Sequence, residues 1–354
     1  MSLWQSLTAD DVHKHLDAGA EFLDWFRKGK EFVGEPRVKL PNAVDADVLL
    51  ERLGVSRADR VATLASRPDP DDTSALWWLL ERSYSELVSD IGGGAMLLPD
   101  LPLELGQLGR HIYVWLFLAA IPSVREYHTS RGIPENISWA SLGDLGLQMN
   151  AYRRIYGTSG LHTQTWLTLT FRGGLYILGR LQFDRTTIPA DFPPGPDGVA
   201  GPHRGKGAVS VHIPAHGVLD FDECNQSMAR ASEFFPRHFP DQPVHYMLAL
   251  LGWMLDKQLT DYLPPESNLL RFQRRFNIVP AEKQEEPMAG WTGGDRAMLK
   301  FVFNRTVGSA DPSQLLDELP QETTLQRAFV THVRSGKHWY QRTGWYPLGD
   351  AIRG

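Results

Sequence analysis

The sequence predicts an α+β protein with two domains, on two observations. Up to about residue 156, apolar residues recur at helical spacing, as in "TSALWWLLERSYSELVSDIG" and "ISWASLGDLGLQMNAYRRIYG". After residue 160, short apolar runs such as "LYILGRLQF" are typical of strands. Because 354 residues are enough for two hydrophobic cores, we expect a helical domain over residues 1–156 and a β-sheet domain over residues 157–354.

The composition argues against several classes of function. A hydrophobic fraction of 42% and a charged fraction of 22% are those of a globular protein, and a net charge of −6 disfavours a DNA-binding surface. The apolar run from Ile112 to Pro122 is about half as long as a membrane-spanning helix, so it predicts a buried helix and no membrane partner. A single cysteine, Cys224, and an N-terminus without the pattern of a signal peptide predict a cytoplasmic protein.

In the second half, the sequence predicts three strands, then a helix, a strand and a helix. The expected strands are "QTWLTLTF" (164–171) and "LYILGRLQF" (175–183), joined as a hairpin across "RGG", then "AVSVHI" (208–213) and "VHYMLALLGWMLD" (244–256). A further strand pair is expected in "FNIVPAEK" (276–283) and "AMLKFVFNR" (297–305). The later helices are expected in "KQLTDYL" (257–263), "ESNLLRFQRRF" (266–276) and "TTLQRAFVTHVRSGKHWY" (323–340).

A sharp corner is expected at "VSVHIPAHGVLD", residues 209–220. Simple alternation places Ser210 and His212 on the strand face opposite the aliphatic side chains. Asp220 and Glu223 are spaced as in a capping box. The corner therefore joins the end of a strand to the start of a helix.

Four strings of the second half resemble the GNAT superfamily of N-acyltransferases, and in particular its two-domain bacterial subgroup. They are "LGRLQF" (178–183), "VHIPAHG" (211–217), "SMARASEFF" (227–235) and "SNLLRFQRRF" (267–276). That subgroup has a helical N-terminal domain before a GNAT-like C-terminal domain with a mixed β-sheet. The resemblance covers most of the chain. It implies transfer of an acyl group from a pantetheine thioester to an amine of a small molecule by direct attack.

The resemblance also implies that the donor binds at the corner. In that fold the strand of His212 splays from its neighbour, and backbone N–H groups near Ile213 stabilise the oxyanion that develops on the thioester carbonyl. The turn that includes Gly217 and Val218, together with the N-terminus of the next helix, holds the pyrophosphate.

The corner departs from the family pattern, because it has one glycine and three acidic residues, which compete with phosphate for the helix N-terminus. The donor is therefore expected to be one of two alternatives. One is acyl-CoA, with its phosphates bound by "HRGKG" (203–207) and by arginines of a later helix. The other is the 4'-phosphopantetheine thioester of an acyl carrier protein. An aminoacyl-tRNA donor is disfavoured by the net negative charge. The predicted donor contacts outside the corner are Ser267, Asn268, Arg271, Arg274 and Arg275.

The catalytic candidates are His212, Asp256 and His216. An imidazole can change its charge near physiological pH, so His212 is suited to take the proton of the attacking amine; a structural histidine bonded to backbone is the other interpretation. Asp256 is expected to orient a histidine, to bind the substrate ammonium, or to cap the following helix. His216 is expected to touch the donor or to be solvated in its loop. Pro214 prevents a regular helix across "HIPAH", so no metal site is predicted.

Arg180, Gln182, Ser210 and Trp253 are the predicted substrate-binding residues. Arg180 and Gln182 point to one face of their predicted strand, where they either line the acceptor pocket or join the two domains as a buried polar pair. Ser267 and Asn268, named above, are equally suited to cap their helix.

Two other classes of function are considered. A serine hydrolase is not supported, because "GTSGL" (157–161) lacks the last glycine of a nucleophile elbow and precedes a predicted strand. A catalytically silent GNAT-like binding protein remains an alternative, because it would explain the unusual phosphate-binding turn.

Overall fold

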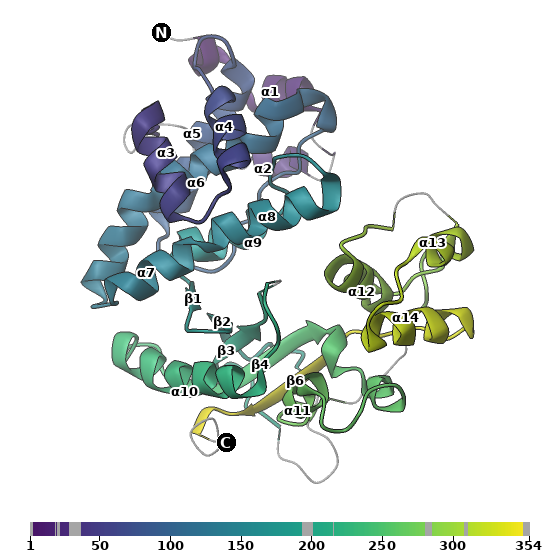
Figure 1. Cartoon of the computed structure of the whole chain (residues 1–354). Helices are drawn as coiled ribbons and strands as arrows, with labels where there is room; N and C mark the ends of the chain where they lie inside the picture. The colour runs from purple at the N-terminus through teal and green to yellow at the C-terminus, as the bar shows by residue number, and fades with distance from the viewer. Residues whose placement is uncertain are drawn as a thin grey trace. The chain divides into compact units, whose positions relative to one another are not determined.

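The computed structural model describes residues 3–17, 19, 22–27, 37–192, 201–214, 216–279, 285–307 and 311–349 (Figure 1). The chain forms two compact units, Met1–Tyr176 and Ile177–Gly354. The first unit is helical, and the second contains most of a β-sheet and further helices. The boundary lies after Tyr176, twenty residues beyond the expected position after residue 156.

Helix α6 (Gly106–Ser130) forms the centre of the first unit. Every residue from Ile112 to Ile121 is at most 5% exposed, which confirms the expected buried helix, and the helix packs against α5 and α9. In the described part of the chain, no helix combines the length and the apolar character needed to cross a membrane. The other helices of this unit are α1 (Ala9–Leu16), α2 (Leu23–Arg27), α3 (Ala43–Arg52), α4 (Arg57–Ala65), α5 (Ser74–Ser89), α7 (Glu135–Leu142), α8 (Asp144–Tyr156) and α9 (Gln164–Phe171), with 3-10 helices Leu3–Ser6 and Leu103–Leu105.

The segment "QTWLTLTF" is helix α9, so the predicted strand and its hairpin across "RGG" are wrong. Its threonines favour a strand, but Leu167, Thr168 and Phe171 are fully buried among helices. A helix satisfies its own backbone hydrogen bonds, so it can be buried without a partner strand. The side chains are also satisfied, because the Met96 amide donates to Thr168 Oγ1 at 2.8 Å. Tertiary packing has therefore overridden the local preference.

The second unit is built on a mixed sheet with the strand order β1-β2-β3-β4-β6-β5. β3 and β4 run parallel, whereas the pairs β2–β3, β4–β6 and β5–β6 are antiparallel. Helix α10 packs on one face of the sheet, where the rings of Phe183 and Phe235 meet edge to face. The strands are β1 (Leu175–Ile177), β2 (Gln182–Thr187), β3 (Gly207–His212), β4 (Val244–Gly252), β5 (Asn277–Ile278) and β6 (Arg342–Pro347). The helices are α10 (Phe221–His238), α11 (Asn268–Gln273), α12 (Gly293–Phe303), α13 (Pro312–Glu318) and α14 (Thr324–Arg334), with 3-10 helices η4 (Trp253–Leu255) and η5 (Lys257–Asp261).

The segment "AMLKFVFNR" is also a helix, α12, and not the predicted strand. Thr292 and Asp295 form a capping box at its start, and Asn304 ends it in the left-handed conformation with φ of 52°. These local signals favour a helix and outweigh the apolar run, which favours a strand. The partner of β5 is instead β6, close to the end of the chain.

His128, near the end of α6, is buried as a neutral ring. Its Nδ1 lies 2.6 Å from Ser138 Oγ, while Nε2 is buried without a hydrogen-bond partner among the residues that the structure describes. Burial lowers the pKa of His128 from 6.5 to about 4. Protonation of this ring is therefore unfavourable in the folded protein.

We expect acid to destabilise the protein through His128. Because the pKa is lower in the folded state than in the unfolded state, the unfolded chain binds the extra proton first. The free energy of unfolding should be fully maintained above pH 6.5 and should fall by up to about 3 kcal/mol as the pH decreases towards 4. Urea unfolding, followed by circular dichroism across this range, measures the loss. The neutral variant His128→Gln should reduce the dependence, although burial also lowers the pKa of His111 and His332, which remain. The exposed control His15→Gln should leave the dependence unchanged. An unchanged dependence in His128→Gln would contradict the assignment.

Candidate functional site

The strands β3 and β4 separate near their C-terminal ends. Their parallel pairing runs from Gly207 and Val244 to Ser210 and Leu248, although β3 continues to His212 and β4 to Gly252. The last residues of β3 remain paired with β2. The sheet therefore opens between its two parallel strands, as the family resemblance implies.

His212 lies at this opening and is paired with a carboxylate. Its Nε2 lies 2.5 Å from Oδ1 of Asp184, and the two side chains are 29% and 11% exposed. In the antiparallel register, Gln182 is opposite His212 and Asp184 is opposite Ser210, so all four side chains lie on one face. The other face is the one covered by α10.

The His212–Asp184 pair has the geometry of an oriented base. When Nε2–H donates to Asp184, the lone pair of the neutral ring lies on Nδ1, which can accept a proton. A carboxylate in this position would also stabilise an imidazolium. Sequence reasoning missed Asp184, although "LQFDR" places it on the same strand face as Gln182. Only the register between β2 and β3 shows that it reaches His212.

Arg180 organises the corner that follows β3. It lies in a bend before β2, so its predicted position on the strand is wrong. Its guanidinium donates to the carbonyl oxygens of Val218 at 2.8 Å and of Pro214 and Gly217 at 3.4 Å. Gly217 has φ of +67°, which favours glycine. Ala215 lies outside the described residues. Arg180 thus holds the carbonyls of the turn in which we expected the donor to bind.

Two arginines lie at the N-terminus of α10. The guanidiniums of Arg271, in α11, and of Arg275, two residues after its end, stack on the ring of Phe221 at 3.7 and 4.7 Å from its centroid. Arg275 also donates to the side chain of Asn225. Asp220 is used as the N-cap and accepts from two backbone amides. The cations therefore offset part of the acidic charge at this helix end.

The basic segment "HRGKG" is not near this corner. It immediately precedes β3, whereas His212 and the corner follow that strand. Six residues of strand span roughly 17 Å, so residues 203–207 do not lie beside the corner and its arginines, with which we expected them to hold the pyrophosphate. The reason is topological, because the two segments lie at opposite ends of one strand.

Asp256 is a buried carboxylate that accepts hydrogen bonds from two separate segments of the chain. It is 2% exposed, and its oxygens accept hydrogen bonds from the backbone and side-chain nitrogens of Gln258 at 3.1 Å and from the Tyr340 amide at 2.8 Å. The expected capping role is confirmed. The carboxylate beside His212 is that of Asp184 and not that of Asp256.

The remaining candidates are placed as follows. Trp253 is 9% exposed and belongs to the hydrophobic core around α12 and α14, which is not a typical substrate-facing position. Ser267 caps α11, confirming that alternative, by accepting from the Leu270 amide at 3.4 Å, with Asn268 as the first helical residue. His216 and Val218 are exposed on the corner. Ile213 follows β3 directly and is partly exposed.

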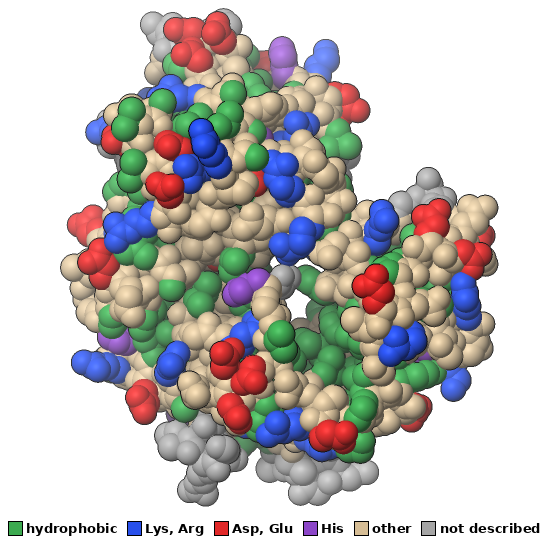
Figure 2. All heavy atoms as spheres, in the orientation of Figure 1, with side chains coloured by type: hydrophobic (Ala, Val, Ile, Leu, Met, Phe, Trp, Pro, Cys, Tyr) green, Lys and Arg blue, Asp and Glu red, His purple; other side chains and the backbone are tan. Residues whose placement is uncertain are grey.

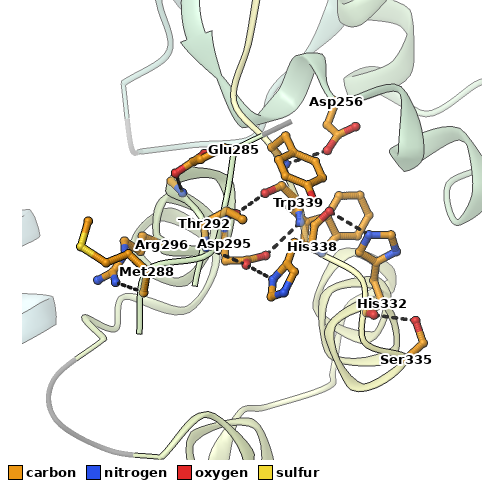
Figure 3. Close-up of polar contacts among 12 residues, drawn as sticks. Asp256, Glu285, Met288, Thr292, Asp295, Arg296, His332, Ser335, His338 and Trp339 are labelled. Carbon is orange, nitrogen blue, oxygen red and sulfur yellow. Dashed lines mark hydrogen bonds and ion pairs between the residues drawn. The ribbon is translucent and has the colours of Figure 1, made fainter. Parts of the chain in front are cut away.

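A second histidine–carboxylate pair lies away from β3 (Figure 3). Nδ1 of His338 is 2.6 Å from Oδ2 of Asp295, a fully buried residue that also accepts from the Trp339 amide at 2.9 Å. Thr292 donates to the Trp339 carbonyl. These bonds tie the start of α12 to the segment before β6, and sequence reasoning missed them. Among the described residues, no group of three or more His, Cys, Asp and Glu side chains is arranged to hold a metal ion.

Known proteins share this architecture. Residues 44–173 match the N-acyltransferase N-terminal domain, and residues 175–346 match the GNAT-like C-terminal domain. None of the curated proteins matches the chain. A solved acyltransferase in complex with decanoyl-CoA and teicoplanin is 35% identical with a TM-score of 0.83, over 97% of this chain and all of that one. A mutant acyltransferase in complex with octanoyl-CoA gives the same values.

These similarities extend over nearly the whole chain and agree with the helical unit and the mixed sheet. The chain belongs to the two-domain N-acyltransferases with a GNAT-like C-terminal domain, and it is an acyltransferase.

Proposed function

We propose that this acyltransferase moves a medium-chain acyl group from acyl-CoA to an amine of a small molecule. The observation that carries the proposal is the opening of the sheet between β3 and β4, with an oriented histidine at the same point. The donor class is supported by similar structures that contain octanoyl-CoA and decanoyl-CoA. The acceptor class is supported by the similar structure that contains teicoplanin.

The donor thioester would lie in the opening beyond Ser210 and Leu248. There the backbone N–H groups of the end of β3, near His212 and Ile213, would stabilise the oxyanion that develops on the carbonyl oxygen of the thioester. The turn at Gly217 and Val218 would approach the pyrophosphate. Its conformation is fixed by Arg180, which binds the carbonyls.

The phosphates would be held chiefly by Arg271 and Arg275. Guanidiniums bind phosphate through two parallel hydrogen bonds, and both groups already lie at the N-terminus of α10. The helix N-terminus adds a favourable dipole, although Asp220 uses part of it. Two cations suit the several phosphate charges of CoA better than the single phosphate of a carrier arm. Ser267 and Asn268, at the start of α11, would lie along the pantetheine.

In the proposed reaction, the amine nitrogen attacks the thioester carbon. The new C–N bond forms, the C–S bond breaks, and the proton lost by nitrogen passes to Nδ1 of His212. Asp184 holds the ring and stabilises its positive charge. The same proton then neutralises the departing CoA thiolate. Because the amine attacks the thioester directly, no covalent enzyme intermediate forms. Ser210 and Gln182, on the face of His212, would contact the acceptor. This pairing favours catalysis over a silent binding protein, because a silent protein has no use for an oriented base.

His212→Ala should lower turnover by about 100-fold or more, because general-base catalysis contributes that much. Asp184→Asn should lower it by about tenfold or more, because the amide fixes the ring less well and cannot stabilise its charge. Neither change should weaken acyl-CoA binding greatly. The assay measures CoA thiol released from decanoyl-CoA in the presence of teicoplanin. His203→Ala, at the other end of β3, is the control. Full turnover in His212→Ala would remove this residue from the mechanism.

Arg271→Ala and Arg275→Ala should each weaken binding of CoA by about tenfold, since each removes a charge-assisted contact to phosphate. Calorimetry with CoA and with decanoyl-CoA measures the dissociation constants. Arg274 was also a predicted donor contact, but it is an exposed C-cap residue of α11, whereas Arg271 and Arg275 lie on Phe221. Arg274→Ala is therefore the matched control. The loss should shrink at high salt, because screening weakens exposed charge pairs. Equal affinities in all three variants would place the phosphates elsewhere, and absent binding in the unmodified protein would favour a carrier-protein donor.

A further inference from the structure

The middle of β4 contains a bulge formed by two exposed leucines. Ala249 pairs with Gly344 and Gly252 pairs with Arg342, so Leu250 and Leu251 together face the single residue Thr343 on β6. Their side chains are 39% and 66% exposed. Two consecutive exposed leucines are unusual on a strand that lies between two others in the sheet order.

The backbone at Leu251 is also unusual. Its φ is +50°, a left-handed conformation that disfavours residues other than Gly, Asn and Asp. Its amide lies 3.5 Å from Thr343 Oγ1, a long contact that compensates little. Such conformations tend to occur at functional sites, where the local strain serves a purpose. The exposed side chain of Leu251 is therefore a candidate contact for an apolar ligand.

The bulge lies beside the opening of the sheet. Pairing between β3 and β4 ends at Leu248, and Leu250 is two residues further along the same strand. On the second unit, Figure 2 shows hydrophobic side chains gathered in a hollow beside the part that contains α12 and α14. Hydrophobic surface next to a thioester site suits an alkyl chain, whereas it gives nothing to an acetyl group.

We propose that Leu250 and Leu251 contact the alkyl chain of the donor and set its preferred length. The inference rests on the proposed function, since it requires a thioester in the opening between β3 and β4. Each methylene buried against the bulge would raise affinity by up to about fourfold. The occupant is the acyl chain of the bound donor rather than a protein partner, because the bulge is continuous with the strand segment that flanks the reacting carbonyl.

The test compares CoA, acetyl-CoA, octanoyl-CoA and decanoyl-CoA by calorimetry. Leu251→Asn keeps a residue that tolerates the left-handed conformation and removes the apolar surface. Leu250→Thr removes apolar surface at a position with strand geometry and introduces a residue that favours strands. In each variant the affinity advantage of decanoyl-CoA over CoA should fall by about tenfold, which equals the loss of one to two buried methylenes. Binding of CoA itself should be unchanged. Phe301→Gln, an exposed apolar-to-amide change on α12, is the matched control, and thermal unfolding verifies that every variant is folded.

The outcomes separate the role of the bulge from the proposed function. If the unmodified protein binds decanoyl-CoA more tightly than CoA, and both variants keep the full advantage, the role of the bulge is overturned while the proposed function stands. The same conclusion follows if the variants weaken CoA and decanoyl-CoA by equal factors. If the unmodified protein binds none of the four ligands, the proposed function fails and the inference fails with it.

Discussion

The site depends on where the parallel pairing of β3 with β4 ends. Ladder hydrogen bonds join the two strands only as far as Ser210 and Leu248. Beyond that point β3 still pairs with β2, and β4 still pairs with β6, so each strand keeps an antiparallel neighbour while the two separate. The strand edges that face this opening no longer bond to each other, and backbone N–H groups require partners. A thioester carbonyl in the opening would supply one.

The corner after β3 shows how charge is arranged around such an opening. Arg180 binds three carbonyl oxygens of the turn, which fixes the direction of its peptide groups. Asp220 caps α10, and its negative charge lies where a phosphate would bind. Arg271 and Arg275 bring positive charge to the same helix end across the ring of Phe221. The acidic turn is therefore compatible with an anionic donor.

Two buried carboxylates hold the strand that faces the bulge. Asp256 accepts from the Tyr340 amide, and Asp295 accepts from the Trp339 amide, just before β6 begins at Arg342. Breaking a hydrogen bond to a buried carboxylate costs free energy, because the carboxylate is then left unsatisfied. These bonds therefore hold the start of β6 in position. Because β6 sets the register of β4, these anchors also fix the bulge, although they lie away from His212. A predicted catalytic role for Asp256 is thus replaced by one of support.

The sequence by itself determined the features that depend on near neighbours. Periodicity located helix α6, cap residues located the starts of α10 and α11, and alternation placed His212 and Ser210 on one strand face. Short strings indicated the family, and therefore the mixed sheet. Contacts between distant segments were decided only by the tertiary structure. Burial made a helix of α9, whose composition favours a strand. The β2–β3 register brought Asp184 to His212, and strand direction separated "HRGKG" from the corner. The reason is physical: caps and alternation act over a few residues, whereas register and burial depend on partners far away in the chain.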